Sequence, residues 1–583
     1  MAEITPMMKQ YLEIKEQNKD SILFFRLGDF YEMFNEDAQL ASRELDLTLT
    51  TRDRGKAAED QTPMCGIPYH SSDAYIARLI AKGYKVAICE QTEDPALAKG
   101  LVKRDIIRVI TPGTVIDSAC LDDRRGNFLC GIFLDGQNAG AAFCDMTTGH
   151  THVTAFSGDD RAEHLYNELS RFSPAEAVLS AGAYDNGELV EYLRDKLSCA
   201  VERGENRFEL KACEKAIRAQ FGEERFASLP RNNPAASLAL GALLSYLHET
   251  QKTDLSYIKD LEYYEQGRFM ELDLSARRNL ELTETIRAKE KRGSLLWVLD
   301  KTKTAMGARN LRAWLTRPLR DVAAIERRLG AVEALTKNTV AREELILSLS
   351  GISDMERLIG RIAYGTAGGR DFASLRNSIE RITEVKAQLT AFTTGRLHEL
   401  DNELDTLTDV AQSIRDTLID EPPFSVREGG FIRKGYNAEV DRLHEILSGG
   451  KGLLADIETR EKEKTGIRTL KIGYNKVFGY YIEVSNSFKD LVPDTYIRKQ
   501  TLVNGERYIT EELKNLEQEI LTAGDRDKAL EFEIFTALRE SVTAESVRIQ
   551  RAAGLIAELD TLCSLASVAV NNNYCRPLSL IHI

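Results

Sequence analysis

The segment from Gly28 to Phe34, GDFYEMF, places an aromatic residue and a carboxylate two positions apart, at Phe30 and Glu32. An aromatic side chain can enter the minor groove of duplex DNA and unstack a base step, most easily where stacking is already poor. A carboxylate beside it can hydrogen-bond the edge of the displaced base. The same charge repels phosphates, so it penalises a duplex that does not offer that bond. This pair therefore has the chemistry to distinguish a mispaired step from a paired one.

A purely structural interpretation of the same residues stays open. An aromatic residue between a strand and a helix often belongs to the core. Asp29 and Glu32 also have the N-cap and N3 spacing of a capping box. On residue types alone this core-and-cap interpretation is the more common one.

A basic segment runs from Lys464 to Arg507. It holds eight Lys or Arg against four acids, a balance of +4 in a chain whose net charge is −14. The acidic total argues against a nucleic-acid binder, but binding depends on where the positive charges lie. Such a segment can grip phosphates without distinguishing base sequence. A solvated basic hairpin is the alternative.

Other chemistry is not indicated by the sequence. No G-x-x-x-x-G-K-[ST] motif occurs; the nearest stretch, SGGK at 448–451, has Glu445 and Gly452 where the motif needs Gly and Ser or Thr. We therefore expect no ATP hydrolysis, no cofactor and no catalytic residue in this chain. The nine cysteines form no C-x-x-C pair, so no zinc site is expected, and they fit reduced thiols in the cytoplasm. His150 and His152 alternate on a predicted strand, and we expect them to face solvent.

The elements that would position these residues follow from the hydrophobic patterns. Thr5-Pro6 predicts a helix start, Ser21–Leu27 a strand, and residues 31–45 a helix. No signal peptide and no apolar run of about 18 residues is found, so no membrane association is expected. The length predicts about four domains at ~150 residues each. The predicted segments are 1–113 (mixed α/β), 114–258 (α/β), 259–425 (long helices), 426–514 (a β-rich tip with helix ends), 515–577 (returning helices) and 578–583 (an anomalous tail).

These segments resemble the MutS family of bacterial DNA mismatch-recognition proteins. The similarity covers most of the chain and is most specific at GDFYEMF, which matches the family's mismatch-recognising Phe-x-Glu at Phe30 and Glu32. Further similar segments are TPMCGIPYH (62–70), residues 87–114, 270–285 and 295–319, GYNKVFGYYIEVSN (473–486) and YIRKQTLVNGERYI (496–509).

The resemblance implies a multidomain α+β fold. A small α/β mismatch-binding domain would be followed by an RNase H-like connector and by a long-helix lever core with an inserted β-rich clamp. Phe30 would enter the minor groove and Glu32 would bind the displaced base. The further DNA-contact candidates are Tyr31, Met33, Arg498, Lys499 and Asn504. Four arginines of the helical core could also form a DNA-facing patch, but we expect most of them to be solvated or packing charges: Arg277, Arg278, Arg309 and Arg312.

The resemblance also implies partners. The family forms homodimers on mismatched or looped duplex DNA, couples binding to ATP and Mg²⁺ through a C-terminal ATPase domain, and recruits a MutL-type protein. Because no ATPase motif is found, we expect a chain cut short before that domain, with its dimer contacts reduced. The alternative is a MutS-like helical scaffold or adaptor, for DNA junctions or repair partners, that does not recognise mismatches.

Overall fold

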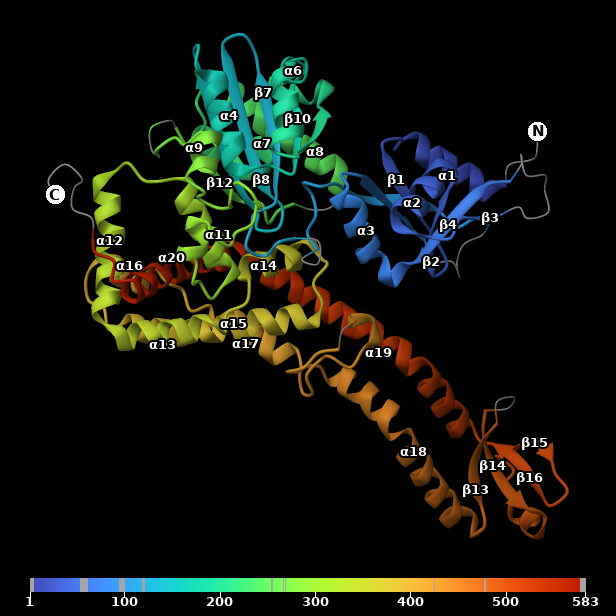
Figure 1. Cartoon of the computed structure of the whole chain (residues 1–583). Coiled ribbons are helices and arrows are strands. Elements are labelled where there is room, and N and C mark those ends of the chain that lie inside the picture. The colour runs from blue at the N-terminus through green and yellow to red at the C-terminus, as the bar shows by residue number, and fades with distance from the viewer. Residues whose placement is uncertain are drawn as a thin grey trace. The chain divides into compact units, whose positions relative to one another are not determined.

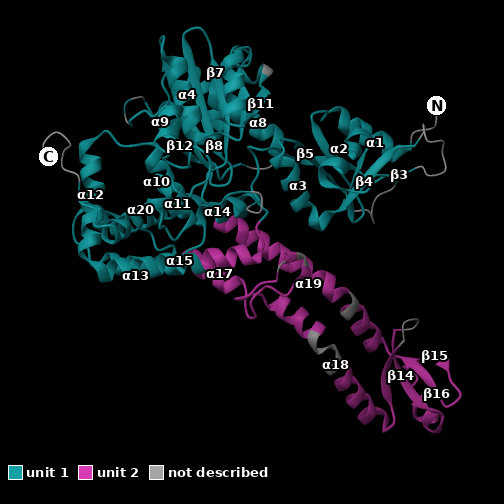
Figure 2. Cartoon of the chain, viewed as in Figure 1, with its two compact units in different colours: residues 1–366, 377–407, 543–583 teal, residues 367–376, 408–542 magenta. Residues whose placement is uncertain are grey.

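The computed structural model describes residues 5–52, 61–93, 100–117, 121–252, 255–265, 267, 269–423, 425–475 and 479–576. The chain divides into two compact units, coloured teal and magenta in Figure 2. Unit 1 contains Met1–Thr366, Asn377–Leu407 and Thr543–Ile583, and unit 2 contains Ala367–Arg376 and Thr408–Val542. The multidomain α+β architecture expected from the sequence is confirmed.

The first part of unit 1 is a six-stranded sheet with the strand order β3-β4-β2-β1-β5-β6 (Figure 1). Strand β1 (Ser21–Leu27) is parallel to β5 (Lys85–Gln91) and antiparallel to β2 (Phe30–Phe34). Both faces of β1 are buried, because Phe24 packs in one apolar cluster and Leu23 in another. The remaining elements are α1 (Pro6–Glu16), α2 (Asn35–Leu45), β3 (Thr50–Thr51), β4 (Pro63–Pro68), α3 (Ser72–Ala81) and β6 (Arg104–Ile110).

The helix predicted over 31–45 begins later than expected. Residues 30–34 form strand β2, and α2 starts at Asn35. Strand β2 pairs with β1 on one side and with β4 on the other, so the backbone groups on both of its edges are hydrogen-bonded. Strand β4 lies about thirty residues further along the chain, and this non-local pairing overrides the local helical pattern. The N-cap predicted at Thr5 is confirmed, since its side chain accepts from the backbone N–H of Met8.

The next part of unit 1 is a second six-stranded sheet, ordered β11-β10-β7-β8-β9-β12. Strands β7 (Phe128–Leu134), β8 (Asn138–Asp145) and β9 (His150–Ser157) form the antiparallel meander predicted from the sequence. Parallel strands extend it on both sides. The other elements are α4 (Arg161–Phe172), β10 (Glu176–Leu179), α5 (Ala181–Tyr184), α6 (Gly187–Glu191), β11 (Ala200–Arg203), α7 (Leu210–Ala227), α8 (Ala235–Gln251) and β12 (Asp260–Tyr263).

Helix α8 crosses β7 and β8 at two glycines. A Cβ atom on Gly131 would lie 2.2 Å from the carbonyl oxygen of Ala239, and one on Gly140 would lie 2.1 Å from that of Ala235. The helix backbone therefore packs directly on the strand backbone, which no residue with a side chain would permit.

Helix α20 (Ser546–Asn571) is the central element of the helical core of unit 1. Its residue Asp560 is buried and accepts hydrogen bonds from the backbone N–H groups of Lys303 (3.0 Å) and Thr304 (2.7 Å). By length and composition α20 could cross a membrane, but 67% of its apolar window is buried, as in the core helix of a folded domain. It contacts α10 (Leu295–Leu299), α11 (Ala305–Thr316), α12 (Val322–Lys337), α13 (Thr339–Leu349), α14 (Met355–Tyr364) and α16 (Gly395–Glu403).

Unit 2 contains two long helices and a small sheet, together with α17 (Thr408–Thr417) and the first turns of α15 (Gly369–Leu389). Helix α18 (Ala438–Thr465) leads to the sheet and α19 (Glu511–Ala544) returns from it, as predicted (Figure 1). Ion pairs such as Arg526–Glu439 (3.0 Å) join the two helices along their length. The sheet has the order β13-β14-β16-β15 and is antiparallel throughout. Its strands are β13 (Lys471–Asn475), β14 (Gly479–Ser485), β15 (Ile497–Thr501) and β16 (Gly505–Ile509).

We predict that Gly140→Ala destabilises unit 1, because the added methyl group would meet a backbone oxygen that moves only if α8 moves. Overpacking of this kind costs about 1–3 kcal/mol. The measurement is the midpoint of urea unfolding followed by circular dichroism. Gly136→Ala is the matched control, since a Cβ at Gly136 has nothing within 4 Å. Equal midpoints for the two variants would contradict the close packing of α8.

Candidate nucleic-acid interface

Phe30 is the first residue of β2, immediately after the turn that joins it to β1. Residues Leu27 and Phe30 are paired, so Gly28 and Asp29 make a two-residue hairpin loop. Gly28 has φ +56°, a conformation that suits glycine at the first position of such a turn. The carbonyl of Asp29 accepts from the backbone N–H of Tyr69 (3.0 Å), which fixes the loop. The Phe30 side chain is 47% exposed on this rigid support.

Glu32 follows Phe30 on the same face of β2, because side chains two residues apart in a strand share a face. Its carboxylate is half-buried, and an oxygen lies 4.0 Å from the Arg52 guanidinium. Burial raises the pKa of Glu32, and the charge of Arg52 opposes that rise. The residue opposite Glu32 on β4 is Gly66, where a Cβ would lie 3.5 Å from the Glu32 Cγ atom and 3.9 Å from the Phe30 ring. The glycine keeps this face open.

The core-and-cap interpretation is wrong for this segment. Phe30 is exposed rather than buried, and no helix begins at Asp29, so Glu32 closes no capping box. The aromatic group and the carboxylate are presented side by side on a strand that is hydrogen-bonded on both edges.

The prediction that Tyr31 and Met33 contact DNA is contradicted. Their side chains point to the opposite face of β2 and lie in the core, with exposures of 6% and 0%. The Tyr31 hydroxyl donates to the carboxylate of Glu90, which also pairs with Arg26 at 3.4 Å. The Arg26 guanidinium stacks 3.5 Å from the centre of the Tyr69 ring. Tyr31, Arg26, Tyr69 and Glu90 thus support the hairpin. The sequence did not reveal this role, because Tyr69 and Glu90 are far along the chain from the hairpin.

Part of the basic segment Lys464–Arg507 lies on the antiparallel sheet of unit 2. Arg498 and Lys499 are exposed on the edge strand β15, where the register shifts between Arg498 and Gln500. Asn504 is exposed in the turn before β16, next to Val503, whose side chain is 93% exposed. The three residues predicted to contact phosphates are therefore accessible at one edge of this sheet.

Acids inside the sheet offset part of its positive charge. Glu506 pairs with Lys489 (2.7 Å) and Arg498 (3.4 Å), and the hydrogen bond from Lys489 is the main reason that the pKa of Glu506 falls to about 2. Arg507 pairs with Glu483 at 3.2 Å. In the part of the chain that the structure describes, no carboxylate pairs with Lys499. Its charge is available to an external anion.

Three other features singled out in the sequence lie outside the candidate DNA-binding residues. The stretch at 448–451 lies inside α18 and not in a strand-to-helix loop. Arg309 is a packing charge, since it pairs with Asp354 (2.6 Å) and Glu356 (2.7 Å). The expectation that His150 and His152 face solvent is wrong: both are partly buried, and they pair with Asp260 (2.6 Å) and Glu262 (3.0 Å) on the neighbouring strand β12.

Three family models match the chain: MutS domain I at residues 5–119, MutS domain II at 127–259 and MutS domain III at 275–566. Proteins named DNA mismatch repair protein MutS are also similar over nearly the whole chain. That of Acetivibrio thermocellus is 48% identical over 581 residues, which cover 99% of this chain and 66% of the relative. That of Alkaliphilus oremlandii is 46% identical over 581 residues, with the same two coverages. That of Lachnoclostridium phytofermentans is 45% identical over 579 residues, 99% of this chain and 62% of the relative.

The chain therefore spans just under two thirds of the length of these relatives, and it matches all three MutS domain models in order. It belongs to the MutS family of DNA mismatch repair proteins.

Proposed function

We propose that this protein recognises mismatched or looped-out positions in double-stranded DNA by inserting Phe30 into the minor groove. Glu32 then hydrogen-bonds the displaced base, while Arg498, Lys499 and Asn504 hold phosphates. The observation that carries the proposal is the exposed Phe30 ring beside a half-buried carboxylate on a rigid strand.

Exposure of Phe30 supports a role outside the core. A large aromatic side chain kept in water forgoes the stabilisation that burial would give, of the order of 1.5–3 kcal/mol. The ring sits on a strand paired on both edges, and its neighbours Tyr31 and Met33 are fixed in the core. A wedge held in this way enters DNA without the cost of ordering a mobile segment.

Glu32 supports discrimination between duplexes. A charged carboxylate near the backbone phosphates disfavours every duplex, and only a base displaced from its pair compensates with a hydrogen bond. Because burial raises the pKa of Glu32, the group becomes neutral at a higher pH than an exposed glutamate does. Protonation of Glu32 therefore reduces the repulsion between its carboxylate and the phosphates of matched DNA.

The partners of the family follow as further proposals. We infer a homodimer on DNA, a MutL-type partner, and, in a longer form of the protein, coupling to ATP and Mg²⁺ through residues outside these 583. The eight cysteines that the structure describes are free thiols, seven of them buried, which supports a location in the reducing cytoplasm.

Phe30→Ala is expected to remove the preference for mismatched DNA. Base–aromatic contacts are worth about 1–3 kcal/mol each, so the affinity for a G·T duplex should fall about tenfold or more while matched affinity changes little. The measurement is the ratio of the two dissociation constants at one fixed salt concentration. Leu49→Ala, which truncates another exposed apolar residue of the same domain, is the control. A wild-type protein that binds both duplexes equally would favour the scaffold alternative.

Glu32→Gln is expected to tighten binding to matched DNA, because it keeps the shape of the side chain and removes the charge that repels phosphates. Fluorescence anisotropy with a matched duplex measures the change. An unchanged matched affinity would refute the repulsive role of Glu32.

A pH titration tests the same carboxylate without changing the DNA. The pKa of Glu32 is raised, so lowering the pH toward that value neutralises the group and should strengthen matched-duplex binding by the wild type. Glu32→Gln has no charge to lose at this position and should lack that component. Identical pH profiles for the two proteins would assign the effect to other groups.

Lys499→Ala is expected to weaken binding to matched and mismatched duplexes alike and to reduce the salt slope by about one unit. Binding isotherms over a series of salt concentrations provide the slope. Lys337→Ala removes an exposed lysine at the end of α12 in unit 1 and serves as the control. A loss confined to mismatched DNA would contradict a phosphate contact.

A further inference from the structure

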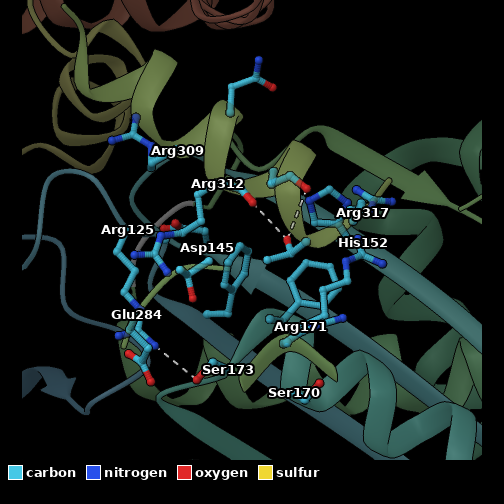
Figure 3. A pocket seen from close by; sticks show the side chains of 18 of the residues that line it. Arg125, Asp145, His152, Ser170, Arg171, Ser173, Glu284, Arg309, Arg312 and Arg317 are labelled. Carbon is cyan, nitrogen blue, oxygen red and sulfur yellow. Dashed lines mark hydrogen bonds between the residues drawn. The ribbon is translucent and has the colours of Figure 1, made fainter. Parts of the chain in front are cut away.

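A cavity of about 760 Å³ lies inside unit 1, between the second sheet and the first helices of the helical core. Its walls come from the ends of β7 and β9, the C-terminal turn of α4, helix α9 (Leu274–Asn279) and one face of α11. Arg309, Arg312 and Thr316 line it from α11 at the spacing of successive helical turns. Figure 3 shows side chains from these separate elements around the cavity. The volume is in the range of small-molecule sites, roughly 300–1,000 Å³.

The lining carries an excess of positive charge. Nine lysines and arginines line the cavity against five aspartates and glutamates, in a chain whose net charge is −14. Three of those acids are already engaged: Glu356 with Arg309, Asp260 with His150, and Asp145 with the backbone N–H of Thr147 (2.9 Å). Because Arg309 is taken up by Glu356 in return, the lining keeps an excess of four positive side chains, nine against five.

Two arginines of the lining are short of counter-charge. Arg312 and Arg277 make no ion pair within 4.0 Å with any residue that the structure describes, and the Nε atom of each is buried without a hydrogen-bond acceptor there. Burial lowers the pKa of both guanidinium groups, that of Arg277 to about 10. The neighbouring cations Arg171 and Arg125 act in the same direction. The acids nearest to the two arginines oppose the effect, Glu168 at Arg277 and Asp122 and Glu284 at Arg312, but none of them forms an ion pair within 4.0 Å.

The half-buried arginines lower the stability of the folded protein when no anion is bound beside them. A half-buried cation without a counter-ion destabilises a fold, and an anion that binds beside it recovers part of that loss. Guanidinium groups match phosphoryl oxygens in particular, through paired N–H donors. Apolar side chains complete the lining: Phe172 is stacked on Phe143 with ring centres 4.0 Å apart, and Met306 and Ile286 also face the cavity.

We propose that this cavity binds a small phosphorylated molecule, whose phosphoryl oxygens are held by Arg312, Arg277 and Arg125 and whose remaining part packs against Phe172. Arg125 lines the cavity and is exposed, and it donates to the hydroxyl of Ser173 (3.3 Å; Figure 3). The site is separate from Phe30 and Glu32, so it does not depend on the function proposed above.

Isothermal titration calorimetry of the whole chain with inorganic pyrophosphate and with ribose 5-phosphate tests the proposal. At least one probe should bind more tightly than sulfate at equal ionic strength. Arg312→Met and Arg277→Met should each weaken that binding roughly tenfold or more, because each removes charge-assisted hydrogen bonds. Arg231→Met removes an exposed arginine that does not line the cavity, and it should leave the affinity unchanged.

Thermal unfolding distinguishes a ligand site from a structural role for these arginines. Methionine retains an apolar stem and removes the uncompensated charge, so the ligand-free variants should unfold at the same temperature as the wild type or higher. Tighter binding of pyrophosphate would indicate an inorganic ligand, and tighter binding of ribose 5-phosphate an organic one. The proposal fails if neither probe exceeds sulfate, if Arg231→Met weakens binding equally, or if Arg312→Met lowers the unfolding temperature without changing the affinity.

Discussion

The buried carboxylate of Asp560 joins the two ends of the helical core of unit 1. It accepts from the backbone N–H and hydroxyl of Thr304, 256 residues earlier in the chain, and so holds the N-cap residue of α11 from a different helix. Residue 307 is a glycine whose added Cβ would lie 2.3 Å from that carboxylate, so the contact leaves no room for a side chain. Burial raises the pKa of Asp560, and the three donors from Lys303 and Thr304 favour its charged form. The core is complete only after the chain has made the whole of unit 2 and returned.

The candidate recognition site depends on the two faces of strand β2, one of which is buried and the other exposed. Strand β2 sends Tyr31 and Met33 into the core and leaves Phe30 and Glu32 on the other face, with Gly66 opposite. The strand is fixed by hydrogen bonds on both edges, so the exposed ring stands on a rigid base. An exposed aromatic group is unfavourable for folding, which is why its position on such a strand points to an intermolecular role.

Positive charge is concentrated in two places in this acidic chain, the sheet of unit 2 and the cavity of unit 1. On the sheet of unit 2 the cations are exposed, partly offset by Glu506 and Glu483, and suited to long-range, salt-sensitive contacts with phosphates. In the cavity of unit 1, Arg312 and Arg277 are half-buried, and the Nε atom of each lacks an acceptor among the described residues. A buried cation interacts more strongly with an anion than an exposed one does, and it selects by shape as well as by charge. The two clusters therefore suit different anions.

The sequence by itself determined the family, through a heptapeptide and several longer matches, and most of the elements, because periodicity and caps are local properties. The strand Ser21–Leu27, the β7–β9 meander and the long helices α18 and α19 follow from such patterns. Only the tertiary structure decided that residues 30–34 form a strand, that Tyr31 and Met33 are buried, and that His150 and His152 are paired. Each of these depends on a partner far away in the chain, such as β4 or β12, and hydrogen bonds and burial supplied by distant segments outweigh local propensity.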